Sequence, residues 1–164
     1  MLSDCCLLIK IGFSQFNSKD VIDMGCMFDG FYSLKSINFS NFNTNHVTNI
    51  MNSLFWECSF LTNVDLSNFN TNNVINIGAM FYRYSSLTNI NLSNFNTDNL
   101  TGMFFMFAKC RSLNFIDLAN FNTNNVTSMC SMFEGCYSLK TNNLSNFNTI
   151  NTINMIRMFY KCSL

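Results

Sequence analysis

Hydrophobic and polar positions recur along this chain with a nearly constant period. Two phenylalanine columns show the repeat, because consecutive members of each are 26, 27, 26, 26 and 26 residues apart. A fixed period of this length indicates one structural unit stacked on copies of itself, since a lone unit cannot cover its own apolar side. The first column is Phe16, Phe42, Phe69, Phe95, Phe121 and Phe147, and the second is Phe28, Phe55, Phe81, Phe107, Phe133 and Phe159.

The first half of each unit has the alternation of a short strand. Residues 61–69 follow the spacing L-x-x-V-x-L-x-x-F, which matches the strand and turn of a leucine-rich repeat. Because strand side chains alternate between faces, Val64 and Leu66 should point inward while Asp65 and Ser67 point outward. One such strand per unit predicts a parallel sheet.

The second half of each unit has the spacing of an amphipathic helix. Apolar residues lie at offsets 0, 3, 6, 7 and 10, and Thr71 or Asn72 could cap the helix amides in that unit. A helix this short is marginal alone, so packing must hold it. The sequence therefore predicts an α/β, leucine-rich-repeat-like solenoid with one short parallel strand and one short helix per 26-residue repeat. In one unit the apolar stripe consists of Val74, Ile77, Met80, Phe81 and Tyr84.

The full phrase L-S-N-F-N-T-x-x-V-T-x-M-x-x-M-F-x-x-C-x-S-L carries a resemblance over essentially the whole chain. It resembles the repeat of the BspA-like leucine-rich repeat surface proteins of bacteria, which also occur in some parasitic protists. The resemblance implies a binding scaffold with a role in adhesion and host-surface contact, and no shared active site. It also implies a secreted or cell-surface location, although the chain has no export signal or anchor and a cytoplasmic location stays open. Its most diagnostic positions include Met103, Met106, Phe107, Cys110 and Leu113.

The pattern predicts a single repeat domain over residues 1–164 with about six repeats, starting and ending within a repeat. Stacked repeats normally need polar caps at their ends, and none is visible. We therefore expect a fragment of a longer array, or end-to-end self-association through uncapped repeats. The sixth unit departs from the pattern at Asn142 and Thr152, where other units carry apolar residues.

Composition narrows the partner classes. Of the 164 residues, 48% are hydrophobic and 11% charged, with a formal net charge of zero and 29 asparagines. Such a chain should fold, but it offers no basic footprint for nucleic acid and no polybasic signal for anionic membranes. No apolar run approaches the roughly 20 residues of a spanning helix, so membrane insertion is not expected.

The cysteines are interpreted as small core residues. One column holds cysteine in most units but also Phe31 and Tyr84, and a position that accepts aromatic rings is hydrophobic. The alternatives are a disulfide between neighbouring units, such as Cys110 with Cys136, or a metal bound along the column, although a spacing of 26 residues lacks zinc-site character. The column contains Cys5, Cys58, Cys110, Cys136 and Cys162, and Cys6, Cys26 and Cys130 lie outside it.

No pattern indicates a catalytic, metal or cofactor site. His46 is the single histidine, and an ordinary surface role is expected for it. Asp65 and Asp117 share a column with Asn38, Asn91 and Asn143, which fits a solvated polar face better than a weak cation site. We therefore expect a protein that is not an enzyme and has no cofactor.

Asparagine and threonine also form columns where the chain should turn. Asn70 and Thr71 belong to these columns, which recur in the neighbouring units. The simpler interpretation is that these side chains satisfy turn backbone and cap helices, forming hydrogen-bonded ladders between units. The alternative is a polar lattice that binds a repetitive ligand such as a glycan or ice.

The helix side offers a candidate partner surface, because aromatic side chains lie there at outward or flanking positions. We expect a non-enzymatic scaffold that binds a protein or glycan on an extended face, or alternatively a structural spacer that displays other domains of a surface protein. The candidate residues are Trp56, Tyr82, Phe104, Phe105 and Tyr160, with Ile156 beside them.

Overall fold

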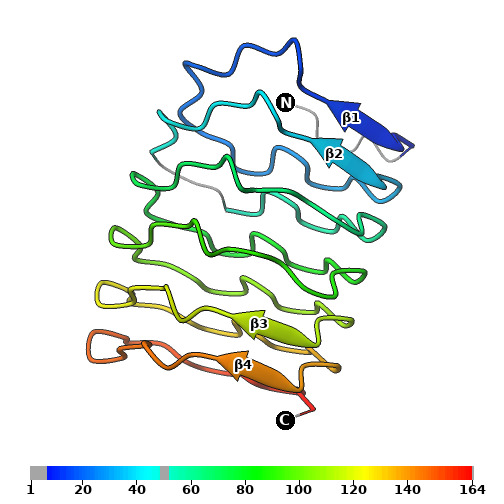
Figure 1. The fold of residues 1–164 in the computed structure, drawn as a ribbon. Helices are drawn as coiled ribbons and strands as arrows, with labels where there is room; N and C mark the ends of the chain where they lie inside the picture. Colours follow the sequence, from blue (N-terminus) through cyan, green and yellow to red (C-terminus); the bar gives the residue numbers. More distant parts are fainter. Residues whose placement is uncertain (1–6, 49–51, 164) are drawn as a thin grey trace.

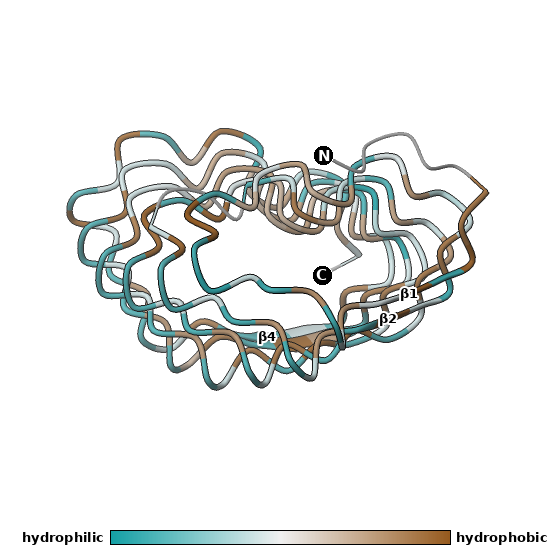
Figure 2. Cartoon of the chain, turned by 90° about the horizontal axis from the view of Figure 1, so that it is seen from above, coloured by the Kyte–Doolittle hydropathy of each residue, from teal (hydrophilic) through white to brown (hydrophobic). Residues whose placement is uncertain are grey.

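The computed structural model describes residues 7–48 and 52–163. Each 26-residue unit forms one rung, and the rungs stack so that the chain runs from one end of the molecule to the other (Figure 1). Seen along the stack, each rung is a flattened loop with two long sides, and strands lie on one of them (Figure 2).

The strand side carries four strands of three residues each: β1 (Lys10–Gly12), β2 (Ser36–Asn38), β3 (Phe115–Asp117) and β4 (Thr141–Asn143). β1 pairs with β2 and β3 with β4, both in parallel and in the register of the repeat. One isolated parallel bridge extends the first pair to Asn63. The predicted parallel pairing is therefore present at both ends of the stack, while the described residues of the two middle units form no strand.

The fold-class prediction of one strand and one helix per repeat is wrong, because the described residues contain no helix and only four short strands in two small sheets. The segments that should be helical instead form a series of turns whose backbones are bonded from one rung to the next. In every one of these segments except the last, 154–162, alternate amides donate to carbonyls of the next rung, at N···O distances from 2.6 to 3.2 Å. We call this side of the molecule the turn ladder; it consists of residues 24–31, 52–58, 76–84, 102–110, 128–136 and 154–162.

Backbone conformation explains why a helical spacing gives turns. Ala79 and Arg83 have φ angles of 52° and 57°, in the left-handed region. That reversal points the amides of Ile77, Ala79 and Phe81 at the next rung rather than along a helix axis. Every rung repeats the same two reversals, and each costs a residue other than glycine about 1 kcal/mol. The bonds between rungs offset that cost.

The core lies between the two long sides. The apolar stripe predicted for a helix is buried almost completely, with Val74, Ile77, Met80, Phe81 and Tyr84 at most 1% exposed. The second phenylalanine column forms a continuous stack: neighbouring rings lie 5.4 to 5.8 Å apart, with interplanar angles between 6° and 12°. The pattern of burial was thus predicted correctly, although the conformation that produces it was not. On the strand side Leu66 is buried and Asp65 and Ser67 are exposed, as predicted.

Threonine hydroxyls hold the rungs together where the chain bends between its two sides. The Asn96 amide donates to Thr71 Oγ1 at 2.8 Å, and that hydroxyl donates to the Asn96 carbonyl at 2.9 Å. Equivalent bonds link Thr44 to Asn70 and Thr123 to Asn148. The asparagine side chains accept from the amide two residues on, as Asn70 Oδ1 does from Asn72 at 3.0 Å. The described residues contain no helix to cap, so these groups satisfy turn backbone instead, and asparagine amides such as that of Asn70 also donate to a side chain of the preceding rung.

Candidate partner surface

Four of the five candidate residues form one aromatic cluster on the outward side of the turn ladder. The rings of Trp56 and Tyr82, on adjacent rungs, lie 4.4 Å apart between centroids. Tyr82 meets Phe105 edge to face at 6.1 Å, and Phe105 meets Phe104 at 6.3 Å. All four side chains are half-buried. We call Trp56, Tyr82, Phe104 and Phe105 the aromatic cluster.

Glycine allows one member of the cluster to lie flat on the neighbouring rung. A Cβ atom at Gly78 would lie 2.6 Å from Phe104 Cζ, which is far too close. Any larger residue at position 78 would therefore displace the Phe104 ring. The cluster depends on this close approach of side chain to backbone.

The fifth candidate, Tyr160, lies apart from the cluster. Tyr160 is 47% exposed, and two cations lie near its ring: Arg157 Cζ and Lys161 Nζ are each 5.3 Å from the ring centroid. Ile156, predicted beside these residues, is 66% exposed on the same rung. The structure thus divides the predicted surface into an aromatic part and a part that contains cations.

Next to the aromatic cluster lies a hollow that sequence reasoning missed. It has a volume of about 520 Å³ and crosses several rungs at the edge of the turn ladder. Four of the nine cationic residues of the chain line it. We call it the basic groove; its lining residues are Ser59, Arg83, Ser85, Lys109, Arg111, Glu134, Gly135, Tyr137, Tyr160 and Lys161.

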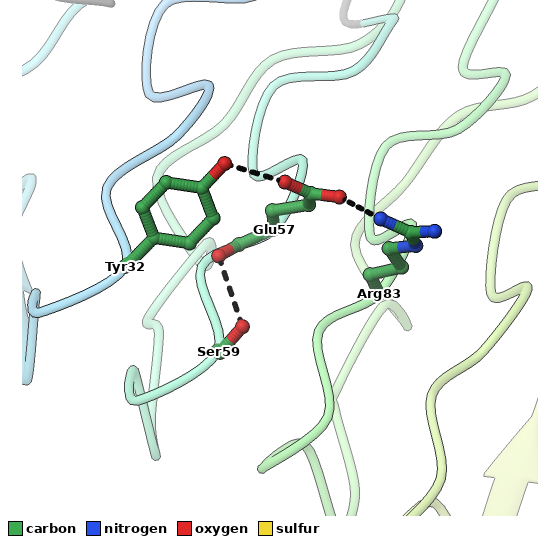
Figure 3. Close-up of polar contacts among 4 residues, drawn as sticks. All are labelled: Tyr32, Glu57, Ser59 and Arg83. Carbon is green, nitrogen blue, oxygen red and sulfur yellow. Dashed lines mark hydrogen bonds and ion pairs between the residues drawn. The ribbon is translucent and has the colours of Figure 1, made fainter. Parts of the chain in front are cut away.

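One end of the groove is fixed by a hydrogen-bonded network across three rungs (Figure 3). The Tyr32 hydroxyl donates to Glu57 Oε2 at 2.7 Å, and the Arg83 guanidinium forms an ion pair with Glu57 Oε1. Ser59 Oγ donates to the Glu57 carbonyl at 3.2 Å. The bond from Tyr32, together with that from Arg83, lowers the pKa of Glu57 against the opposing effect of burial. Arg83 is therefore neutralised within the fold.

The other three cations of the groove keep their charge available. Within the described part of the chain, no carboxylate lies within 4.0 Å of Lys109, Arg111 or Lys161. Aromatic rings flank them instead: Lys109 Nζ lies 5.4 Å from the Tyr82 centroid, and Arg111 Cζ lies 5.9 Å from that of Tyr137. A cation held over a ring keeps its ammonium or guanidinium donors for a further partner.

A column in the sequence was the signal that could have revealed this groove. Glu57, Arg83, Lys109, Gly135 and Lys161 are each 26 residues apart, so the stack places them in one line. The formal net charge of zero conceals this concentration, because it sums over the whole chain.

The described members of the cysteine column are free thiols, three of them buried and Cys162 half-buried. Cys58, Cys110 and Cys136 are 0% exposed, and the six described cysteines form no disulfide with one another. Each column thiol donates to a carbonyl of the preceding rung, as Cys110 Sγ does to Phe81 O at 3.0 Å. Burial raises the pKa values of Cys58 and Cys136 to about 12. Cys5 and Cys6 lie outside the described residues.

Other predicted polar positions serve local structure. Asp65 Oδ1 accepts from the Ser67 amide at 2.9 Å and Asp117 Oδ1 from the Ala119 amide at 3.0 Å, and Asn38, Asn91 and Asn143 make the same turn. Aspartate and asparagine interchange here because either side chain closes it. His46 Nδ1 lies 2.6 Å from the Lys19 carbonyl. Across residues 7–48 and 52–163, no group of three or more metal-ligating side chains comes together.

Four members of the threonine column offer little to a ligand, and the fifth, Thr149 on the last rung, is exposed. Thr44, Thr71, Thr97 and Thr123 are at most 3% exposed. Their hydroxyls bond to backbone groups of the next rung. This geometry matches the simpler interpretation of the polar columns, in which the side chains bind backbone.

A second hollow lies on the strand side, between two rungs that are sparsely bonded there. Its volume is about 600 Å³, and residues 89–93 and 114–120 contribute its lining. Between these two strand-side segments the described structure has one backbone bond, from the Asn114 amide to the Thr88 carbonyl at 3.2 Å. Phe115 is 47% exposed at this place.

No helix in the described residues is long and apolar enough to cross a membrane.

Comparison with known proteins identifies a family of repeat proteins. Neither the curated proteins nor the solved structures contain a significant match. One family model matches residues 6–87 and again residues 51–164, in two overlapping segments that span most of the chain. The chain therefore belongs to the family described as "Mycoplasma protein of unknown function, DUF285".

Proposed function

We propose that this protein is a non-enzymatic repeat scaffold that binds a protein or glycan partner through the outward side of its turn ladder. The proposal places it among adhesion-type surface proteins of the BspA-like kind. The observation that carries it is the aromatic cluster, where the tilted rings of Trp56 and Tyr82 lie 4.4 Å apart between centroids, on a backbone bonded rung to rung. Rigid tryptophan and tyrosine side chains, with arginine nearby, are the residues that contribute most to binding interfaces.

Rigidity supports the same proposal. The backbone beneath the cluster is held by bonds such as Ala79 N–H to the Phe104 carbonyl at 2.8 Å and Phe81 N–H to that of Met106 at 2.9 Å. A surface ordered before binding loses little conformational entropy when a partner arrives. The strand side has fewer such bonds, so it is the less suitable half of the molecule for an extended interface.

The test is a binding measurement with paired variants. The purified chain is presented to a panel of extracellular matrix proteins and to a glycan array, and each ligand found is titrated against Tyr82→Ala and Phe115→Ala. Loss of an interface aromatic should weaken binding at least tenfold, or about 1.4 kcal/mol, for Tyr82→Ala. Phe115→Ala removes an exposed ring from the strand side and should leave affinity unchanged.

Two outcomes would contradict the proposal. If the intact chain binds no ligand on either panel, the result would favour a structural spacer that displays other domains. Binding that Phe115→Ala abolishes and Tyr82→Ala leaves intact would place the interface on the opposite side of the molecule. Circular dichroism of both variants would show that the fold is retained.

A further inference from the structure

We infer that the basic groove is a binding site for an acidic saccharide, one that carries carboxylate or sulfate groups. This inference rests on the proposed function and names a ligand class for one part of the turn-ladder surface. The basic groove lies beside the aromatic cluster, because two of its lining residues, Arg83 and Lys109, each place a cation 5.4 Å from the Tyr82 ring centroid.

The cations of the groove favour an anionic ligand. Lys109, Arg111 and Lys161 line the groove without a carboxylate within 4.0 Å in the described structure. Glu134 also lines it, but it forms no ion pair with these cations at that distance. The groove therefore holds an excess of positive charge, and anionic groups with several oxygens match the fork of arginine and the point charge of lysine.

Hydrogen-bond acceptors also line the groove. Ser59 Oγ already donates to the Glu57 carbonyl at 3.2 Å, and Ser85 Oγ donates to the Ser59 carbonyl at 3.5 Å. Both hydroxyls therefore present lone pairs, as does the carboxylate of Glu134. A ligand that fits must bring hydroxyl donors as well as anionic oxygens. A saccharide has both, whereas the phosphoryl group of a doubly ionised phosphate monoester has no donor.

Two exposed tyrosines form part of the lining of the groove. Tyr137 and Tyr160 are 48% and 47% exposed, so their rings can be reached by a ligand in the groove. The C–H face of a sugar ring packs on such a ring while its hydroxyls stay hydrogen-bonded. The volume of about 520 Å³ lies within the range of small-molecule sites and suits about one or two sugar units.

Gly135 leaves space in the groove because it has no side chain. The same column carries Lys109 and Lys161 on the adjacent rungs, so a long side chain at position 135 would fill the groove between them. Gly135 has a φ of 71°, and Lys109 and Lys161 have φ angles of 62° and 59°. The backbone of this column therefore accepts residues other than glycine, and the opening at Gly135 can be closed by substitution.

The test uses the full chain and a matched pair of oligosaccharides that share one backbone, one sulfated and one unsulfated, with a uronic-acid oligomer as a third ligand. Titration calorimetry at low salt should show binding of the two acidic ligands and none of the neutral one. The triple variant Lys109→Ala, Arg111→Ala, Lys161→Ala should weaken that binding at least thirtyfold. The matched control, Lys10→Ala, Lys19→Ala, Lys35→Ala, removes three exposed lysines elsewhere and should weaken it less than threefold.

A second variant separates shape from charge. Gly135→Gln keeps the net charge and fills the opening, and it should weaken binding at least tenfold. Thermal unfolding of each variant shows that the fold is intact. If Gly135→Gln binds like the parent while the triple variant does not, the cations act as a surface patch and the groove is not the site.

Other outcomes overturn the inference in distinguishable ways. Equal losses in both triple variants would show nonspecific attraction of charge. Inorganic phosphate, a phosphopeptide or a single-stranded oligonucleotide that competes as well as the sulfated oligosaccharide would assign the groove to another class of anion. A chain that binds matrix proteins or neutral glycans but no acidic saccharide would refute this inference while the proposed function stands, and a chain that binds no ligand would refute both.

Discussion

The two long sides of the molecule are ordered by different means. On the turn ladder every rung is bonded to the next by several backbone amides, from Cys26 to Gly135 as donors. On the strand side β1 and β2 form one small sheet and β3 and β4 another. Between them, the described residues 62–66 and 88–92 share no backbone hydrogen bond. The side without regular secondary structure is therefore the more continuous of the two.

This difference shows that the stack is specified by columns of side chains. On the turn ladder six phenylalanine rings lie nearly parallel, one above another, and the cysteine column lies beside them. Each buried ring fixes the distance and rotation of the next rung, so amides and carbonyls meet in register. The strand side presents small polar side chains outward and has less to align it.

The largest expected effect compares one phenylalanine from each side. Phe107 is 0% exposed in the middle of the ring stack, and Phe115 is 47% exposed on the strand side. Phe107→Ala should lower the free energy of unfolding by about 3–5 kcal/mol, because it leaves a cavity between two rings. Phe115→Ala should cost less than about 1 kcal/mol, since most of its ring already meets water.

Chemical denaturation of the two variants, followed by circular dichroism, measures this difference. Phe107→Leu serves as a second control, because it fills much of the same space and should recover part of the loss. If Phe107→Ala and Phe115→Ala lower the free energy of unfolding by the same amount, the two sides of the molecule contribute equally to stability and the ring stack has no special role.

The second prediction concerns alkaline pH and again involves the turn ladder. Burial raises the pKa of the Cys136 thiol to about 12, whereas an unfolded thiol titrates near 8.5. Because the folded pKa lies above the unfolded one, the folded state holds its proton more tightly. The stabilisation is complete below about pH 8.5 and is lost as pH rises toward 12, by about 1.4 kcal/mol per pH unit for each such thiol.

Cys136→Ala tests this sign. Unfolding free energies between pH 8.5 and 11 should fall less steeply for the variant than for the parent, even though the variant is less stable at neutral pH. Cys58, whose pKa is also raised to about 12, should give the same result. If the free energy of unfolding falls equally steeply with pH in the variant and the parent, the thiols are accessible to solvent, contrary to their position in the core.

Which residues are buried could be predicted from the sequence, because burial follows the repeat. The predicted inward positions Leu66, Phe81 and Tyr84 are all buried, and the cysteine column is the hydrophobic position that aromatic substitution indicated. Periodicity reports which side chains avoid water. It does not report how the backbone bends to place them there.

The helix was predicted wrongly because offsets of three and four residues also arise from successive turns. The decisive feature is the left-handed backbone at positions such as Ala79 and Ser131, and neither residue signals it. Gly30 and Gly135 were the one available clue, since both lie in a column that needs positive φ. The basic groove was missed for a related reason: its cations come from different rungs, and only the stacking distance brings them together.

The third prediction tests the bend between the two sides. Thr71 is 3% exposed, and its hydroxyl both accepts from the Asn96 amide and donates to the Asn96 carbonyl. Thr71→Val keeps the shape but removes both bonds, and it should lower the free energy of unfolding by about 1–2 kcal/mol. Thr101→Val is the control, because Thr101 is exposed and water can replace its bond to the Ile75 carbonyl. A loss at Thr101 as large as that at Thr71 would contradict a special role for the buried column.

The last comparison, between two substitutions at Lys109, separates turns from a helix most directly. Lys109 has a φ of 62°, a conformation that glycine adopts freely and that a β-branched residue resists. Lys109→Gly should therefore be more stable than Lys109→Val, by about 1–2 kcal/mol in the free energy of unfolding. Both variants lose the cation over Tyr82, so that loss cancels between them. In a helix valine would be the more stable of the two, by a few tenths of a kcal/mol. The order of the two midpoints in one denaturation experiment thus decides whether the backbone at Lys109 is turned, as found here, or helical.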